Sequence, residues 1–145
     1  MLQSMTIVEL PQDCPSSYTK VIEWIFSHIG QVKALDTDLI DVGTMLMASL
    51  ASVSVAFDGL LDGCVANGLQ RADVSEMASH CLLGLSLLLK NGMHPAILRE
   101  NISSCRGCTI RGLLTVEKAV VRSAFAESII NGTKHLQDLQ KHPFA

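Results

Sequence analysis

Aromatic side chains, clustered charge and a glycine-rich phosphate turn are what this sequence lacks. Only 4% of its 145 residues are aromatic, and the formal net charge is −3 with lysine and arginine scattered along the chain. Binding to nucleic acid needs a basic patch, so we expect no nucleic-acid partner. The sequence contains no Gly-x-Gly-x-x-Gly pattern, so nothing in it predicts a dinucleotide site, and we expect no bound cofactor.

Targeting and membrane signals are also missing. The first five residues, Met-Leu-Gln-Ser-Met, have neither the basic start nor the apolar core of a secretory signal, which predicts a cytoplasmic protein. The longest uncharged stretch, Val42 to Phe57, is shorter than the ~20 residues that a membrane helix needs. We therefore expect a buried helix there and no membrane contact. Five cysteines, an odd number, favour free thiols over a disulfide framework.

Apolar residues make up 48% of the chain, mostly aliphatic, which favours packed helices and a buried subunit interface. Pro15 to Ser17 predicts the start of a first helix, with Gly30 as its C-terminal cap. Asp36 to Asp38 begins an apolar run that no proline interrupts, which predicts one continuous helix from about Asp38 to Ala66.

Later helices are indicated by their end signals. Asn67-Gly68 ends the long helix, Asp73 and Glu76 form a capping-box pattern, and Asn91-Gly92 ends the leucine-rich segment that follows. His94-Pro95 begins a short helix, and residues from Ile110 to about Gln140 form the last helical stretch. Strand-prone residues occur at Thr6 to Glu9 and less clearly at Val32 to Leu35, so the predicted class is all-α with at most a short N-terminal strand.

Four stretches carry a resemblance to a known family. They are Ile29 to Val32 before Asp38 to Asp41; Asp62 to Val65 with Gly68-Leu69; His94 to Ser104; and Gly107 to Leu113. From about Tyr18 to Leu139 the chain resembles the C-terminal dimerisation domain of pyrroline-5-carboxylate reductase. The resemblance implies a helical bundle like the C-terminal domain of 6-phosphogluconate dehydrogenase and an interlocked homodimer. Residues 16–145 would be this domain, and residues 1–15 an N-terminal remnant or linker.

The family resemblance also implies a binding loop for the substrate carboxylate. The matching loop of the family reads approximately Ser-Pro-Gly-Gly-Thr-Thr-Ile, and hydroxyls with backbone amides at a helix start bind anions well. By position, Ser104, Gly107, Cys108 and Thr109 inherit the role of binding a small-molecule substrate.

Three departures from the family pattern change this expectation. The family's Gly-Ser-Gly-Pro signature is replaced by Ala48 to Ser52, where Ser49 and Ser52 are candidates to line the pocket. The proline and first glycine of the anion loop have become Cys105 and Arg106, and the Gly-Gly expected before the last helix is replaced around Ala119-Val120. The family's N-terminal dinucleotide-binding half has no counterpart in the sequence, with Met5 to Glu9 as the one candidate for its last strand.

Candidate catalytic residues are Asp58, Arg106 and Thr109. Asp58 lies in an apolar helical stretch, where a carboxylate tends to have a raised pKa, whereas Asp41 and Asp62 are assigned structural hydrogen bonds. The Arg106 guanidinium could bind a carboxylate, enolate or phosphate, or be a solvated loop charge.

Two other patterns have structural readings beside the functional ones. Cys105 and Cys108 form a Cys-x-x-Cys pair that could serve redox chemistry or bind a metal. Because a second pair with metal-ligand spacing is missing, we interpret the two cysteines as small residues of a tight loop and expect no metal site. His94, which could be a general acid or base, is expected to cap the short helix.

Three functions remain open from the sequence. The first is a cofactor-independent, non-redox enzyme of cyclase or isomerase type, acting on an acid, imine or carbonyl compound in secondary metabolism. The second is the substrate-binding and dimerisation part of a pyrroline-5-carboxylate reductase of proline biosynthesis, completed by a separate NAD(P)-binding domain. The third is a non-catalytic dimerisation partner of a full-length reductase. The altered signature segment favours the first, and we expect no reduction by the chain alone.

Overall fold

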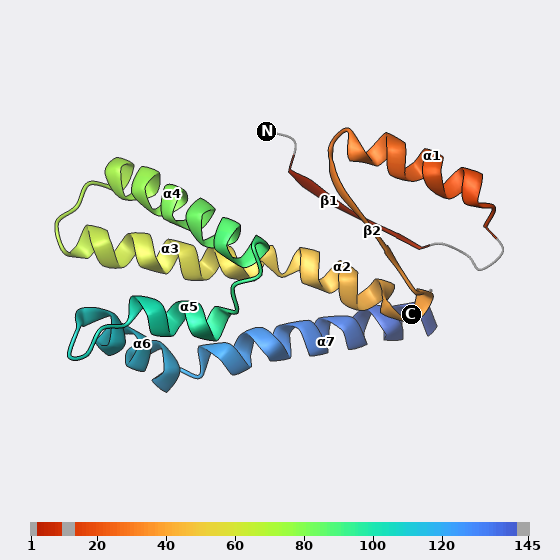
Figure 1. Ribbon diagram of the computed structural model, residues 1–145. Helices are drawn as coiled ribbons and strands as arrows, with labels where there is room; N and C mark the ends of the chain where they lie inside the picture. The colour runs from red at the N-terminus through yellow and green to blue at the C-terminus, as the bar shows by residue number, and fades with distance from the viewer. Residues whose placement is uncertain (1–2, 10–13, 142–145) are drawn as a thin grey trace. The chain divides into compact units, whose positions relative to one another are not determined.

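The computed structural model describes residues 3–9 and 14–141, and its elements fall into two compact units (Figure 1). One unit contains the described residues up to Leu50 together with those from Ala126 onward. The other contains Ala51–Phe125. Each unit is described below by itself.

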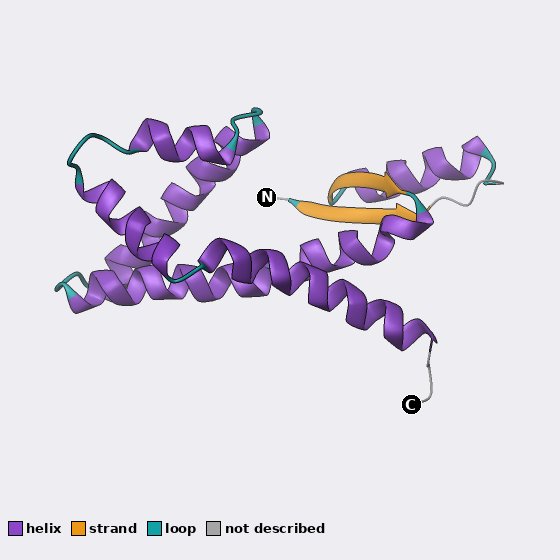
Figure 2. Ribbon diagram, turned by 90° about the horizontal axis from the view of Figure 1, so that it is seen from below, coloured by secondary structure: helices purple, strands orange, loops and turns teal. Residues whose placement is uncertain are grey.

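The first unit begins with two paired strands and the helix that connects them. Strand β1 (Ser4–Glu9) pairs in parallel with β2 (Gly30–Leu35), and α1 (Ser16–Ser27) packs against β2. Figure 2 shows the two strands in orange beside each other. Gly30 is required in β2 because a Cβ there would overlap the Ser4 carbonyl. Gly30 therefore opens a strand, and the prediction that it caps the first helix is wrong, since α1 ends at Ser27.

A 3-10 helix and two α-helices complete this unit. A short 3-10 helix, η1 (Thr37–Leu39), leads into α2 (Ile40–Ala48), and the last helix, α7 (Val121–Lys141), reaches the unit with its C-terminal part. The Thr37 hydroxyl donates to the Glu9 carboxylate at 2.6 Å, which joins η1 to the end of β1. Gly132 of α7 leaves room for Met45 of α2, because a Cβ there would lie 2.8 Å from the methionine sulfur. Asp41, which we expected to bond structurally, accepts a hydrogen bond from Gln140 at 3.1 Å.

The second unit consists of helices only. They are α3 (Leu50–Ala66), α4 (Arg71–Lys90), α5 (Pro95–Ile102), α6 (Cys108–Lys118) and the first residues of α7. Gly68 and Gly92, with φ of 98° and 87°, end α3 and α4, as their sequence positions predict. The His94 ring accepts a hydrogen bond from the Ala96 N–H at 3.2 Å and caps α5, which confirms its structural reading.

The all-α class is confirmed, with a short sheet of two strands where at most one strand was expected. The expected continuous helix from Asp38 to Ala66 is interrupted: α2 ends at Ala48, Ser49 lies in a turn with φ −65° and ψ −13°, and α3 begins at Leu50. The stretch from Ile110 to Gln140 is helical as expected and contains two helices, α6 and α7, because Val120 adopts a φ of 56° between them. A left-handed residue ends a helix as effectively as a proline.

The expected capping box at the start of α4 is not formed. Gln70 is the N-cap residue, it makes no side-chain cap, and Asp73 lies inside the first turn. Asp73 still favours the helix, because a negative charge in the first turn interacts well with the helix dipole.

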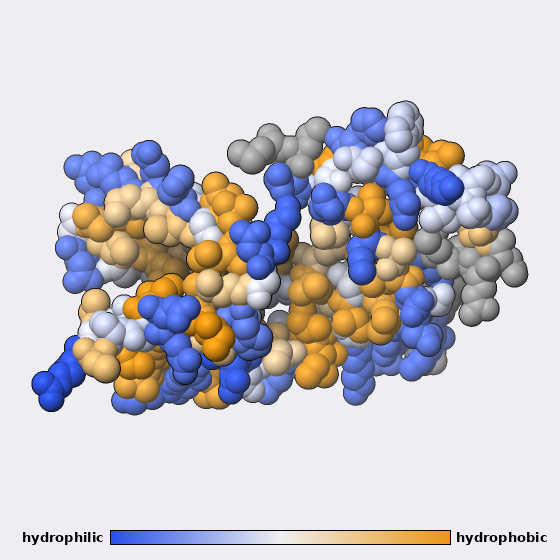
Figure 3. Space-filling model, viewed as in Figure 1, coloured by the Kyte–Doolittle hydropathy of each residue, from blue (hydrophilic) through white to orange (hydrophobic). Residues whose placement is uncertain are grey.

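A single chain leaves most of its apolar side chains open to solvent. Among the described residues only Leu61, Val74 and Leu98 are buried apolar side chains, one each from α3, α4 and α5. The accessible surface is 11583 Å² for 15.6 kDa, whereas a folded monomer of that mass exposes about 7,200 Å². Figure 3 shows hydrophobic residues, in orange, gathered on the visible face of each unit.

The excess of roughly 4,000 Å² is several times the ~800 Å² that one partner buries in an ordinary interface, and it fits an obligate assembly. By length and composition, Thr37–Ala66 and Arg71–Lys90 are also apolar enough to cross a membrane, although core helices of other proteins pass the same test. Val42 to Phe57 was expected to form a buried helix. This expectation is wrong for the single chain, because none of the apolar stretch within Thr37–Ala66 is buried.

Candidate functional site

The loop that joins α5 to α6 forms a tight hydrogen-bonded turn. The Gly107 N–H donates to the Ser104 carbonyl at 3.1 Å, so residues 104–107 form a four-residue turn. Its third residue, Arg106, has a φ of 59°, which is the left-handed conformation that such a turn requires in its type II form. Type II turns favour proline at the second position and glycine at the third. Cys105 and Arg106 therefore occupy positions suited to Pro-Gly.

Space explains why the fourth turn residue is glycine. A Cβ on Gly107 would overlap the Ser104 hydroxyl and lie 3.1 Å from the Ser104 carbonyl oxygen. Gly107 is also the N-cap residue of α6, with φ −71° and ψ 167°. The residue thus allows the turn to run directly into the helix.

The first turn of α6 presents free backbone donors. No side chain caps this helix, and the N–H groups of Cys108, Thr109 and Ile110 have no hydrogen-bond acceptor within residues 14–141. The first N–H groups of a helix carry a partial positive charge and bind carboxylates and phosphates. The start of α6 is therefore suited to an anion.

Side chains of the loop add further donors. In the part of the chain that the structure describes, the hydroxyls of Ser104 and Thr109 make no hydrogen bond and the Arg106 guanidinium makes no ion pair. Ser104 and Arg106 are exposed, and Thr109 is half-buried. Five of the predicted site residues, Ser104 and Arg106 to Thr109, thus lie within one turn and the helix start that follows it. This arrangement can bind a carboxylate and hold it in one orientation.

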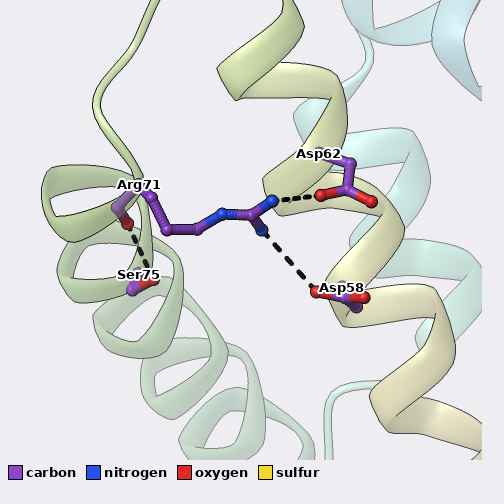
Figure 4. Close-up of polar contacts among 4 residues, drawn as sticks. All are labelled: Asp58, Asp62, Arg71 and Ser75. Carbon is purple, nitrogen blue, oxygen red and sulfur yellow. Dashed lines mark hydrogen bonds and ion pairs between the residues drawn. The ribbon is translucent and has the colours of Figure 1, made fainter.

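Asp58, the remaining catalytic candidate, belongs to a different cluster (Figure 4). The Arg71 guanidinium of α4 lies 3.6 Å from the Asp58 carboxylate and donates a hydrogen bond to Asp62, both of α3. The hydrogen bond with Asp62 raises the pKa of the Arg71 guanidinium above its ordinary value, with smaller Coulombic contributions from the two carboxylates. The cluster joins α3 to α4 across the turn at Gly68.

The apolar surroundings expected for Asp58 are not found. Its side chain is 71% exposed and ion-paired with Arg71, so the carboxylate is not held in apolar surroundings in the single chain. Asp62, expected to make a structural hydrogen bond, does so with Arg71. In the sequence, the ion pair between Asp62 and Arg71 is indicated only by their opposite charges on either side of the turn at Gly68.

Ser49 and Ser52 are not hydrogen-bonded to the loop. The Ser49 hydroxyl donates to the Leu46 carbonyl at 2.6 Å, which is a common bond of serine to the preceding helical turn. Ser52 is half-buried in α3. Their role in binding substrate stays a prediction.

A groove of about 260 Å³ lies between α5 and α6 beside the loop. It is lined by Ala96, Arg99 and Glu100 of α5, by the C-cap residue Ser103, and by Ile110, Leu113, Leu114 and Glu117 of α6. The Ser103 hydroxyl is buried without a hydrogen-bond partner. Arg99 and Ser103 were not among the predicted site residues, although the helical spacing of the eight positions is visible in the sequence.

No group of three or more metal-binding side chains occurs among the described residues. All five cysteines are free thiols.

The sequence model of one family, described as pyrroline-5-carboxylate reductase dimerisation, matches residues 37–139. Curated relatives agree. A pyrroline-5-carboxylate reductase of Neurospora crassa is 40% identical over 133 residues, which cover 90% of this chain and 40% of that protein. One of Schizosaccharomyces pombe is 32% identical over 96% of this chain and 50% of its own length. The chain thus spans half or less of these relatives.

Solved structures show the same fold. A Plasmodium falciparum pyrroline carboxylate reductase with NADP bound has a TM-score of 0.84 at 22% identity, covering 92% of this chain and 54% of its own. A Coxiella burnetii pyrroline-5-carboxylate reductase has a TM-score of 0.84 at 18% identity, covering 94% of this chain and 52% of its own. The similarity reaches beyond residues 37–139, since 92% of 145 residues is about 133, and so includes part of the β1–α1–β2 segment.

These relatives correct the functional expectation. The matched proteins are consistently named reductases, so the prediction of a cofactor-independent cyclase or isomerase in secondary metabolism is wrong. The match to a dimerisation family supports the expected homodimer and accounts for the exposed apolar helices. The chain belongs to the pyrroline-5-carboxylate reductase dimerisation family.

Proposed function

We propose that this chain is the dimerisation and substrate-binding part of a pyrroline-5-carboxylate reductase. In this role α6 and its preceding turn bind the substrate carboxylate, and the apolar helices form the subunit interface. Dinucleotide binding comes from a further α/β domain. The activity then depends on residues outside this sequence, on the same or another polypeptide.

One observation carries the proposal: in the described residues β1 and β2 form a parallel sheet of only two strands. Parallel sheets are normally covered on both faces, and two strands alone are marginal. Here α1 packs against β2 but leaves Tyr18, Val21 and Trp24 at 64%, 53% and 66% exposure. An apolar surface of this kind is expected where further α/β layers join. Dinucleotide-binding domains are built from such parallel βαβ units.

The described residues do not fit a dinucleotide phosphate. A phosphate cradle needs a glycine-rich turn between a strand and a helix, and neither β1 nor β2 is followed by one: α1 begins after Pro15, and η1 follows Asp36. The cofactor of a reductase would supply the hydride. This chain's own contribution is to bind the carboxylate and orient the substrate.

Orientation follows from the geometry of the loop. The free N–H groups at the start of α6 and the Ser104 and Thr109 hydroxyls can each donate to a carboxylate oxygen. A substrate held by its carboxylate presents the rest of its ring in one direction, which lowers the entropic part of the barrier. Arg106 adds a positive charge at the open side of the turn.

A chimera tests this proposal. The part of the Neurospora crassa reductase that lies outside the match is joined to this chain, and substrate-dependent oxidation of NADPH is followed by absorbance. We expect reductase activity in the chimera and none in the chain alone. Ser104→Ala and Thr109→Ala should each raise KM for pyrroline-5-carboxylate about 10- to 100-fold, the value of one hydrogen bond to a charged group.

Thr115→Ala is the matched control, because this threonine lies on α6 and its hydroxyl is already bonded to the Arg111 carbonyl at 3.1 Å. Its KM should equal that of the parent chimera. The proposal is overturned by a chimera that folds, dimerises and binds NADPH yet reduces no substrate. If the two loop variants match Thr115→Ala in KM, the assignment of the loop is wrong.

A mixed dimer with a full-length reductase is a second proposal, and the exposed leucines of α4 favour it. Leu82, Leu83 and Leu87 are 42%, 46% and 51% exposed in the single chain. The same surface that pairs two copies of this chain can pair it with a relative. Co-expression with a differently tagged full-length reductase should yield heterodimers on native mass spectrometry, and recovery of homodimers alone would refute the idea.

A further inference from the structure

Two exposed thiols lie in the anion loop (residues 104–109), one in its turn and one at the start of α6. Cys105 is the second residue of the turn that the Gly107 N–H closes onto the Ser104 carbonyl, and Cys108 is the first residue of α6. Both thiols are free and exposed. The proposed substrate-binding role uses the backbone at Cys108 but neither sulfur atom.

The spacing suits a small disulfide ring. Two residues separate the cysteines, and the hydrogen-bonded turn of residues 104–107, in which Arg106 is left-handed, contains Cys105 and ends one residue before Cys108. A folded turn has already lost the backbone freedom that closing such a ring would otherwise remove. The other three cysteines, Cys14, Cys64 and Cys81, lie on separate segments of the chain.

The surroundings attract an anionic reaction partner. The Arg106 guanidinium stands between the two cysteines and has no ion pair in the described part of the chain. The start of α6 has no side-chain cap and adds the positive end of an 11-residue helix. Glutathione disulfide is a negatively charged peptide, so both features favour its approach.

We propose that Cys105 and Cys108 form a reversible intramolecular disulfide by exchange with glutathione disulfide. In the first step one thiolate attacks the glutathione disulfide, forms a mixed disulfide and releases one glutathione thiolate. In the second step the other cysteine attacks the mixed disulfide and releases the second glutathione. The pair of thiols loses two electrons and two protons, and one glutathione disulfide becomes two glutathione molecules.

The site is a modification site of the loop itself, and its existence does not depend on the proposed reductase role. Where that role holds, the disulfide joins the turn covalently to the first residue of α6. The oxidation state of the loop and its ability to bind a carboxylate are then linked.

The test compares the folded with the unfolded chain. The full-length chain is equilibrated with glutathione buffers of graded thiol-to-disulfide ratio, quenched with acid, alkylated and digested, and the Cys105–Cys108 peptide is quantified by mass spectrometry. The same titration is run in guanidinium chloride. We expect the equilibrium constant for the ring to be at least about fivefold larger in the folded chain, the factor gained when one residue is ordered beforehand.

Three variants serve as controls. Cys105→Ser and Cys108→Ser should each retain one glutathione as a stable mixed disulfide, because the second attack is removed. Cys81→Ser should leave the equilibrium constant of the pair unchanged. A constant in the folded chain that equals or falls below the unfolded value overturns the proposal, as does bonding of Cys105 or Cys108 to any other cysteine. Reductase activity of the chimera does not enter this measurement.

Discussion

Replacing Val120 with glycine should stabilise the protein, although the change removes an apolar side chain. Val120 has a φ of 56°, and a β-branched residue in this left-handed region is a genuine outlier. The position follows the C-cap of α6, and the Val120 N–H donates to the Glu117 carbonyl at 3.0 Å. Glycine is the usual residue at such a helix end.

The size of the effect follows from three contributions. A left-handed conformation costs a residue with a Cβ roughly 1–2 kcal/mol, and glycine avoids this cost. Glycine loses more backbone entropy on folding, which offsets about 0.5–1 kcal/mol of the gain. The Val120 side chain is 63% exposed, so little apolar burial is lost. The free energy of unfolding should therefore rise by about 0.5–1 kcal/mol, and Tm by about 2–4 °C.

Urea unfolding followed by circular dichroism measures this change. All variants are compared at one chain concentration, because the stability of a dimer depends on concentration. Ala119→Gly is the matched control: Ala119 has φ −79° and ψ 4°, so glycine relieves no strain there. It should lower the free energy of unfolding by about 0.5–1 kcal/mol. The two neighbouring substitutions are thus expected to act in opposite directions.

The reasoning fails if Val120→Gly lowers the urea midpoint as much as Ala119→Gly does. Equal losses would mean that the left-handed conformation stores no strain, or that Val120 is packed by a partner subunit. Val120→Ala distinguishes these two explanations. It keeps a Cβ but removes the branch, so a loss in that variant as well would point to lost packing.

Three further perturbations have defined outcomes. Gly30→Ala should lower the free energy of unfolding by about 1–3 kcal/mol in urea titrations, because the added Cβ meets a backbone carbonyl. Gly132→Ala should lower it by less, since the flexible methionine side chain that its Cβ meets can move. Equal losses in the two variants would contradict this explanation. Asp62→Asn should lower the urea midpoint slightly at low salt, because it removes the exposed ion pair with Arg71. At 1 M salt this ion pair is screened, so the substitution should have no effect there. A decrease in the midpoint that does not depend on salt would contradict an ionic origin. Leu87→Asp should convert the dimer to monomer in sedimentation velocity, and an intact dimer would place the interface elsewhere.

Local signals in the sequence predicted most helix ends. Gly68 and Gly92 end α3 and α4, and His94 caps α5, because each of these features acts within four residues of the chain. The signals failed where a residue broke its own preference. Val120 gives no sign in the sequence that it will be left-handed, and Ser49 none that it will interrupt a helix.

The candidate site, too, could be predicted from the sequence only in part. The loop residues from Ser104 to Thr109 could be grouped from sequence because they are consecutive, so any fold brings them together. The surroundings of Asp58 could not be predicted, since Arg71 lies in the next helix and reaches it only after the chain turns at Gly68. A carboxylate in an apolar stretch of sequence is not thereby a buried carboxylate.

The sequence by itself determined the helical class, the apolar excess that calls for a covering partner and the contiguity of the candidate loop, since composition, periodicity and contiguous motifs act locally. Only the tertiary structure decided that Gly30 pairs with Ser4, that Asp58 is exposed beside Arg71, and that Cys105 lies in a closed turn that ends one residue before Cys108. Those outcomes depend on contacts between separate segments or on backbone conformations that residue preferences oppose. Their free energies come from the packing of the whole chain, which no short stretch of sequence contains.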